Sequence, residues 1–134
     1  MPSLRVGIVG AGFGCYGLAP AFRMDKRCKV EAIAASSLHN AKHAAEIWNI
    51  PTAMKWADLV DSSDIDIIAV AVPPIYQREI LSAAISAGKP VFAEKPLSCT
   101  LSEAEHLTEL AESNTLPNMI DFEFSLFHVG IENL

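Results

Sequence analysis

The feature that most constrains the fold is a glycine-rich turn that directly follows a short apolar run. Residues Leu4–Val9 have the continuous apolar character of a buried strand, and Gly10, Gly12 and Gly14 come immediately after them. Glycine permits a tight turn and a close approach of the backbone to a ligand. A helix that starts there directs free N–H groups and the positive end of its dipole to the same point. The segment therefore predicts the start of a βαβ unit with a site for a diphosphate.

Strands and helices alternate along the rest of the chain. The run Ile65–Val72 is apolar almost throughout, which is typical of a strand buried on both faces of a parallel sheet. Gly88 is placed to end a helix, and Thr100 or Ser102 to cap the last one. We expect further strands at Lys29–Ala35, Thr52–Met54, Pro90–Ala93 and Met119–Phe124, and helices at Gly14–Met24, Asn40–Trp48, Ile75–Ala87 and Ser102–Glu112. The alternation predicts an α/β fold of the Rossmann type, with a doubly wound parallel sheet.

The composition is that of a globular chain with an acidic balance. The 134 residues suffice for one domain with a core but not for two, and 51% are hydrophobic against 19% charged. A net charge of −6 lacks the basic footprint of a protein that binds nucleic acid or an anionic membrane. No apolar run reaches the ~20 residues that span a bilayer, and the N-terminus lacks the pattern of a signal peptide. Cys15, Cys28 and Cys99 are widely spaced, as in a reduced protein. We expect a cytoplasmic protein without a metal site.

The end of the second expected strand bears on the choice of cofactor. Rossmann folds that select NAD often place an acidic residue about 20 positions after the glycines, where it holds the ribose hydroxyls. Here the strand ends in Ala34, Ala35, Ser36 and Ser37, and serine hydroxyls can donate to a 2′-phosphate that an acid would repel. This favours NADP slightly, while NAD stays open because no arginine follows directly. The serines also suit the cap of the next helix, and both roles are compatible.

Two other interpretations of the glycine-rich turn stay open. The turn is glycine-rich without binding anything, or it belongs to a methyltransferase that uses S-adenosylmethionine. Such methyltransferases usually carry an acid at the end of the second strand, and this chain has none there. The usual third glycine of the dinucleotide pattern is replaced by Cys15, which is small enough for the helix to pack closely on the strand.

Two later segments, taken with the glycines, resemble a known family. Ala71–Pro74 reads AVPP, and Ala87–Leu97 reads AGKPVFAEKPL. Together with Gly10 and Gly12 they resemble the glucose–fructose oxidoreductase / inositol dehydrogenase (Gfo/Idh/MocA) family. The resemblance is to the N-terminal Rossmann domain of that family and covers essentially the whole chain.

The resemblance implies roles for several residues. Val72, Pro73 and Pro74 would line the adenosine side of the dinucleotide, and Glu94 and Lys95 would lie near the nicotinamide. In many members this lysine is catalytic or positions the sugar hydroxyl that is oxidised. Its place also fits the residues, since it follows a strand, and ligands of open α/β sheets bind at the carboxyl ends of strands. Taken alone, a lysine here would be read as a surface residue. The expected cofactor-binding residues are Gly10, Gly12, Phe13, Gly14, Ser36, Ser37, Val72, Pro73, Pro74, Gln77, Glu94 and Lys95.

The chain departs from the family in individual residues and in length. Many members have Asn and His where this chain has Ile75 and Gln77, and often Arg where it has Ser125. We expect residues 1–118 to form the dinucleotide-binding domain and residues 119–134 to start the crossover into a C-terminal α/β substrate domain, which is missing. The resemblance implies that this domain carries the catalytic histidine, which His128 does not replace, and most substrate contacts.

Together, the motifs and the resemblance predict an NAD(P)-dependent oxidoreductase. In its full-length context it would transfer hydride between the nicotinamide and a hydroxyl of a sugar, nucleotide-sugar or cyclitol, with Lys95 as the acid/base or positioning group. The alternatives are a non-catalytic dinucleotide-binding module, against which the retained Glu94 and Lys95 argue, and an inactive truncated fragment. We expect the 134-residue chain alone to lack normal turnover and to form a homo-oligomer, as a dimer through its apolar C-terminal end.

Overall fold

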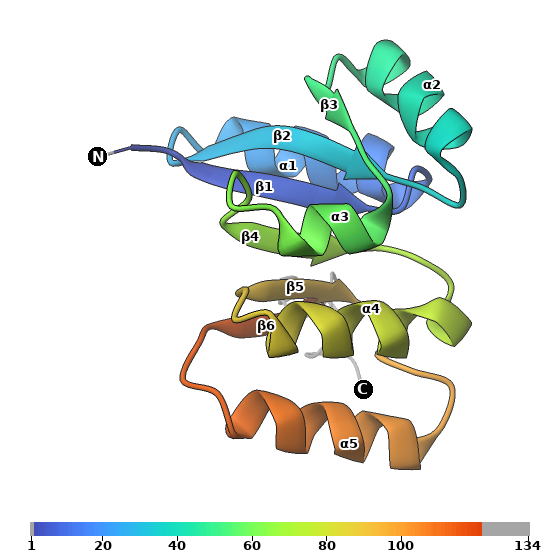
Figure 1. Ribbon diagram of the computed structural model, residues 1–134, viewed down its shortest axis with the longest axis vertical. Coiled ribbons are helices and arrows are strands. Elements are labelled where there is room, and N and C mark those ends of the chain that lie inside the picture. Colours follow the sequence, from blue (N-terminus) through green and yellow to red (C-terminus); the bar gives the residue numbers. More distant parts are fainter. Residues whose placement is uncertain (1, 122–134) are drawn as a thin grey trace, which may run out of the picture.

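A computed structural model describes residues 2–121 and contains one six-stranded sheet. The strand order is β3-β2-β1-β4-β5-β6, and each adjacent pair is parallel (Figure 1). The strands are β1 (Leu4–Val9), β2 (Cys28–Ala34), β3 (Thr52–Ala53), β4 (Ile67–Val70), β5 (Val91–Glu94) and β6 (Asn118–Asp121). The helices are η1 (Gly14–Leu18), α1 (Ala19–Met24), α2 (Leu38–Trp48), α3 (Trp56–Asp61), α4 (Pro74–Ser86) and α5 (Leu101–Glu112). The doubly wound α/β fold predicted from the sequence is confirmed.

Helices cover both faces of the sheet, so the central strands are buried on each side. Figure 1 shows α1 behind the sheet and α3 and α4 in front of it. One core layer joins Ile8 of β1 to Leu18 of η1 and Ala44 of α2. The other layer includes Leu59 of α3 and Leu81 of α4. Burial on both faces explains why the strands read as nearly continuous apolar runs rather than as alternating ones.

The helix α3 is an element that the sequence pattern did not predict. It has only 6 residues, its N-cap residue Lys55 makes no capping hydrogen bond through its side chain, and it buries only Leu59 and Val60. A Cβ atom on Gly7 would lie 2.7 Å from Cδ2 of Leu59, so a glycine at this point of β1 lets α3 pack directly on the sheet. The helix therefore depends on a contact with a distant strand, which no local periodicity reveals.

Several boundaries differ from the expected ones by a few residues. The fourth strand covers Ile67–Val70 instead of Ile65–Val72, because its pairing with both neighbours is confined to the central residues. The first helix begins as one turn of π-helix, Gly14–Leu18. The last strand, Asn118–Asp121, pairs with β5 as part of the same sheet and straddles the expected domain boundary after residue 118. Phe124, Ser125 and His128 lie outside the described residues.

The start of α5 is fixed by a reciprocal cap. Thr100 Oγ1 accepts a hydrogen bond from the N–H of Glu103 at 3.2 Å, and Glu103 Oε2 accepts one from the N–H of Cys99 at 3.1 Å. Thr100, not Ser102, is therefore the cap. The pair resembles a capping box, except that Glu103 accepts from the N–H of the residue before the cap.

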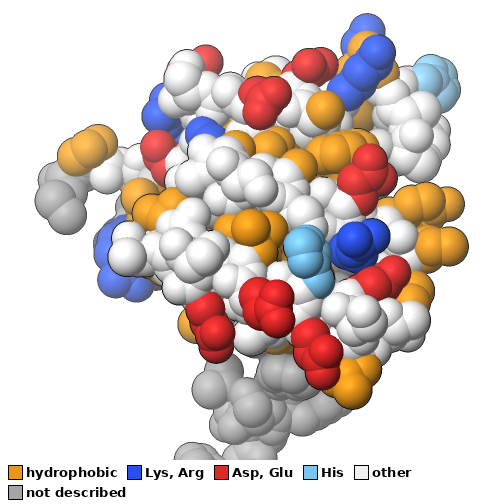
Figure 2. Space-filling model, turned by 60° about the horizontal axis from the view of Figure 1, so that its bottom comes forward, with side chains coloured by type: hydrophobic (Ala, Val, Ile, Leu, Met, Phe, Trp, Pro, Cys, Tyr) orange, Lys and Arg blue, Asp and Glu red, His pale blue; other side chains and the backbone are white. Residues whose placement is uncertain are grey.

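The face that α5 covers is rich in acidic side chains. Figure 2 brings this side of the molecule forward and shows several Asp and Glu side chains with few Lys or Arg between them.

Within the part of the chain that the structure describes, no helix is both long and apolar enough to cross a membrane.

At the amino end of the sheet, Arg5 of β1 binds the loop before β4. Its guanidinium donates to both carboxylate oxygens of Asp66, at 3.0 Å each, and to Asp64 Oδ1 at 3.3 Å. The backbone N–H of Arg5 also donates to Asp66 Oδ2 at 2.8 Å. The hydrogen bonds from Arg5 lower the pKa of the Asp66 carboxyl below its ordinary value. The cluster ties the two central strands together at the edge opposite the functional turns.

This lowered pKa predicts a pH-dependent contribution to stability. A carboxyl whose pKa is lower in the folded than in the unfolded chain stabilises the fold above its unfolded pKa of about 3.9, and loses that effect as the pH falls through its folded pKa. We expect Asp66→Asn to lower the free energy of unfolding at pH 7, and the difference from the wild type to shrink by pH 3. Urea denaturation at both pH values measures this.

Asp64→Asn is the matched control, because the Asp64 side chain is 84% exposed and its ion pair should contribute little. A deficit in Asp66→Asn that is equally large at pH 3 and pH 7 would contradict the assignment.

Candidate functional site

The carboxyl edge of the sheet is where the turns of interest meet. After β1 the chain builds the sheet in one direction through β2 and β3, and after β4 it builds in the other direction through β5 and β6. The order therefore reverses between β1 and β4, and ligands of open α/β sheets bind in the crevice outside the carboxyl ends at such a point (Figure 1).

Gly10 joins three of these turns. Its φ of 121° lies in a region that favours glycine. Its N–H donates to the carbonyl of Ala34, at the end of β2, at 2.8 Å. A Cβ atom on Gly10 would lie 2.1 Å from the carbonyl oxygen of Ala71, just after β4, so no other residue fits without moving the backbone. The turns after β1, β2 and β4 are therefore in direct contact through one residue without a side chain.

Gly12 differs from Gly10 because the space around it is open. A Cβ atom there would meet no described atom within 4 Å, and the residue is exposed. Its carbonyl accepts from the N–H groups of Cys15 and Tyr16 at 3.0 and 3.2 Å, which starts the helix. The first N–H groups of a helix have no partner within it, and they carry the positive end of the dipole. Exposed backbone without a side chain at such a point fits a diphosphate.

The close contact between helix and strand falls on Gly14. A Cβ atom on this buried residue would lie 2.8 Å from Cγ2 of Ile8, so the first turn packs directly on β1. The pattern assigned this role to the position of Cys15, which is instead a fully buried core residue. Burial raises the pKa of the Cys15 thiol, which keeps it protonated.

Phe13 folds back on its own helix. A Cβ atom on Gly17 would lie 2.4 Å from the Phe13 ring, and this ring contacts that of Tyr16 edge-on, with 5.3 Å between the centroids. Tyr16 is 62% exposed. Phe13 therefore offers its backbone rather than a free side chain to a ligand, and the exposed aromatic of this turn is Tyr16, which sequence reasoning missed because nothing in the pattern marks it.

The two serines after β2 have different functions in the fold. Ser37 is the cap of α2, since its Oγ accepts from the N–H of Asn40 at 3.0 Å. Ser36 Oγ accepts from Nδ2 of Asn40 at 2.8 Å and is exposed. Because Asn40 occupies an acceptor position of Ser36, the hydroxyl of Ser36 keeps its proton for donation to a ligand.

The turn after β4 lies against the glycine turn. The Cγ1 atom of Val72 is 3.4 Å from the position of a Cβ atom on Gly10, and Ala71 N–H donates to Val9 O at 2.8 Å. Pro73 is exposed, and Pro74 is the first residue of α4, where its missing N–H costs nothing. The structure therefore brings the AVPP segment next to Gly10.

The turn after β5 carries Lys95, and the buried side chain of Gln77 forms hydrogen bonds with its backbone. Lys95 is exposed, whereas Glu94 and Gln77 are only 7% and 1% exposed. The Gln77 amide nitrogen donates to the carbonyl of Glu94 and, at 3.2 Å, to the carbonyl of Pro96. The Lys95–Pro96 peptide bond is cis. Gln77 is one of the expected cofactor-binding residues, and its buried amide contacts the backbone on both sides of Lys95.

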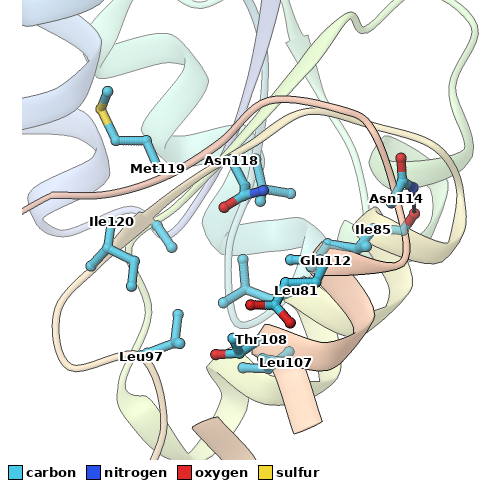
Figure 3. Close-up of a pocket in the computed structure, with 13 residues that line it drawn as sticks. Leu81, Ile85, Leu97, Leu107, Thr108, Glu112, Asn114, Asn118, Met119 and Ile120 are labelled. Atoms are coloured by element: carbon cyan, nitrogen blue, oxygen red, sulfur yellow. Dashed lines mark hydrogen bonds between the residues drawn. The ribbon is translucent and has the colours of Figure 1, made fainter. Parts of the chain in front are cut away.

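A separate hollow lies beneath α5. It has a volume of about 430 Å³ and is mainly apolar (Figure 3). Its lining includes Leu81 and Ile85 of α4, Leu107 of α5, and Met119 and Ile120 of β6. It lies between helices and the outer strands, and its lining includes none of the glycine turn, the serines or Lys95. The cavity is therefore distinct from the carboxyl edge of the sheet at which the strand order reverses.

The chain is similar to known oxidoreductases over most of its length. A family described as an oxidoreductase family with an NAD-binding Rossmann fold matches residues 4–122. The dTDP-3,4-didehydro-2,6-dideoxy-α-D-glucose 3-reductase of Actinomadura kijaniata is 31% identical over 122 residues, which cover 90% of this chain and 37% of that protein. Levoglucosan dehydrogenase of Pseudarthrobacter phenanthrenivorans is 27% identical over 133 residues, covering 92% and 34%. The chain thus spans about a third of the length of these relatives.

Two solved structures have the same fold with NADP bound. A 3-ketoreductase from Actinomadura kijaniata in complex with TDP-benzene and NADP superposes with a TM-score of 0.83 at 31% identity, over 92% of this chain and 39% of that one. Biliverdin reductase from Synechocystis, in complex with biliverdin and NADP+, superposes with a TM-score of 0.80 at 29% identity, over 88% and 37%. With a match that extends from the first strand to the last, this chain belongs to the Gfo/Idh/MocA oxidoreductase family and forms its NAD-binding Rossmann domain.

Proposed function

We propose that this chain is the cofactor-binding part of an NAD(P)-dependent oxidoreductase that acts on a hydroxyl of a sugar, nucleotide-sugar or cyclitol. The observation that carries the proposal is the contrast between two glycines of one turn. Gly10 is required sterically by the Ala71 carbonyl, whereas Gly12 faces open space at the start of a helix. The turn is thus built to present bare backbone to a ligand, and a dinucleotide's diphosphate matches that chemistry.

Each turn at the carboxyl edge has a distinct role in this proposal. The N–H groups of Gly12, Phe13 and Gly14 bind the diphosphate, and Val72, Pro73 and Pro74 line the adenosine side. The bound nicotinamide supplies the hydride acceptor or donor. Lys95 binds the substrate hydroxyl and exchanges a proton with its oxygen, or orients it, from the turn after β5. Glu94, buried beside Lys95, shapes that turn.

The residues after β2 support NADP over NAD. Ser36 is exposed, keeps a proton to donate and has no acidic neighbour in the segment Ala34–Ser37. Both similar structures named above contain NADP. A 2′-phosphate would receive the hydrogen bond of Ser36, while the lack of an acid avoids repulsion.

The proposed substrate class rests on two relatives that are named for sugar substrates, the dTDP-sugar 3-reductase and levoglucosan dehydrogenase. The similarity to biliverdin reductase supports a second candidate, a substrate of the linear tetrapyrrole class. The retained Lys95 favours the hydroxyl chemistry, and it also argues against a module that binds the dinucleotide without catalysis. We further propose a cytoplasmic location, in keeping with three free thiols, and a homo-oligomer.

The two glycines give the first test. Gly10→Ala should destabilise the fold by at least about 2 kcal/mol, because its Cβ overlaps the Ala71 carbonyl. Gly12→Ala should keep stability within about 0.5 kcal/mol, because its Cβ meets nothing. It should nevertheless weaken NADPH binding at least about tenfold, because the methyl group occupies the ligand's approach. Fluorescence titration and urea denaturation measure the two effects, and unchanged NADPH affinity in Gly12→Ala would overturn the site.

The serines separate cofactor choice from helix capping. Ser36→Ala should lower the ratio of NADPH to NADH affinity about tenfold, the usual effect of losing a hydrogen bond to a charged group. Ser37→Ala should lower the free energy of unfolding by about 1 kcal/mol, because it removes the cap of α2. An affinity ratio that does not respond to Ser36→Ala would contradict the proposed 2′-phosphate contact.

The chain by itself should bind NADPH without turning over substrate. The resemblance places most substrate contacts in a further domain, and the chain spans about a third of its relatives. A panel of sugars and cyclitols, with NADP+ reduction followed by absorbance, measures this. Robust turnover by the 134-residue chain would refute the assignment of substrate binding to other parts of the protein.

A further inference from the structure

We propose that Gln77 is a positioning residue, which aims Lys95 by holding the backbone on both sides of it. The inference rests on the proposed function in that Lys95 is the group being aimed. The contact itself is independent of any cofactor and can be tested separately.

The geometry of the contact singles out the segment that bears Lys95. A primary amide has two N–H donors that diverge in one plane. Those of Gln77 reach the carbonyl of Glu94 and the carbonyl of Pro96, the latter at 3.2 Å. The two acceptors lie on either side of Lys95 in the chain, so one buried side chain holds the peptide group before Lys95 and the peptide group after Pro96.

The Lys95 side chain depends on this backbone for its direction. Lys95 is exposed, and in residues 2–121 no hydrogen bond or ion pair holds its amine. The direction of its Cα–Cβ bond is therefore the main restraint on where the amine goes. That direction is set by the backbone on either side of Lys95, which Gln77 holds through the carbonyls of Glu94 and Pro96.

Packing alone does not explain a glutamine at this position. The side chain is 1% exposed, and its Oε1 atom is buried without a hydrogen-bond partner in the described part of the chain. A buried polar atom without a partner is unfavourable, and methionine would fill nearly the same volume without one. What methionine lacks is the pair of donors, so the donors are the feature that Gln77 contributes. Gln77 also lies near the start of α4, the helix that follows the AVPP turn, so it links that turn to the one that bears Lys95.

The test uses the 134-residue chain and follows Lys95 directly. Lysines are dimethylated with ¹³C-formaldehyde, which keeps their charge, and the Lys95 signal is assigned through Lys95→Arg. NADP+ is the probe. We expect it to shift the Lys95 signal in the unmodified chain, and this shift to fall by at least about half in Gln77→Met, while the Kd for NADP+ stays within about threefold. Without NADP+, amide exchange at Lys95 and Leu97 should rise at least about tenfold in Gln77→Met.

Companion variants separate positioning from packing. Gln77→Leu also removes both donors and keeps an apolar side chain of similar volume, so it should behave as Gln77→Met does. It replaces Gln77→Met in the test if that variant does not fold. Gln77→His keeps an N–H donor and should restore part of the NADP+-induced shift. Leu81→Met alters another buried residue of α4 and should change neither readout.

The proposal is overturned if Gln77→Met and Gln77→Leu leave both the Lys95 signal and the amide exchange unchanged, or if Leu81→Met changes them equally. If NADP+ does not bind the unmodified chain, the proposed function fails. The exchange rates at Lys95 and Leu97, measured without NADP+, then still decide whether Gln77 holds this segment.

Discussion

The site depends on the contact between Gly10 and the carbonyl of Ala71, where two chain segments meet with no room for a side chain. The 2.1 Å that would separate an added Cβ from that oxygen makes glycine a steric necessity there. The N–H of Gly10, bonded to Ala34 at 2.8 Å, ties in the end of the second strand. At the point where the strand order reverses, the carboxyl edge of the sheet is therefore formed by backbone whose position is fixed by these contacts. Bare, rigid backbone is suited to a ligand that is recognised by its charge and by N–H donors.

The turn after β5 is held by a different device. Gly10 allows a close approach of two backbone segments because it lacks a side chain. Gln77 instead uses a buried amide, which donates hydrogen bonds to the backbone on either side of the exposed Lys95. Both devices place functional groups on loops and take the rigidity of those loops from the core. Loops can then present polar groups at the surface without the mobility that loops usually have. The Arg5 and Asp66 cluster lies at the opposite edge and serves the fold rather than the site.

Most of the fold could be predicted from the sequence because its signals are local. The apolar run ending at Val9, the glycines after it and the alternation of elements specify a parallel sheet without reference to distant contacts. The helix α3 could not be predicted, since it forms against Gly7 across the sheet. The different roles of Ser36 and Ser37 and the burial of Gln77 could not be predicted either, because they too depend on contacts within the fold. The sequence marks Ser36, Ser37 and Gln77 as polar residues near the carboxyl edge of the sheet. Only their hydrogen-bond partners in the fold show that Ser37 caps a helix, that Ser36 is exposed at this edge and that Gln77 supports a loop.

The central claim is that backbone N–H groups between Gly10 and Gly14 bind the diphosphate of a nicotinamide dinucleotide. The most direct measurement is a ¹H–¹⁵N titration of the chain with NADPH, followed residue by residue. The account predicts saturable shifts that are largest at Gly12, Phe13 and Gly14, at the start of the first helix. Shifts confined to the apolar cavity beneath α5, or no saturable shift in the glycine turn, would contradict it.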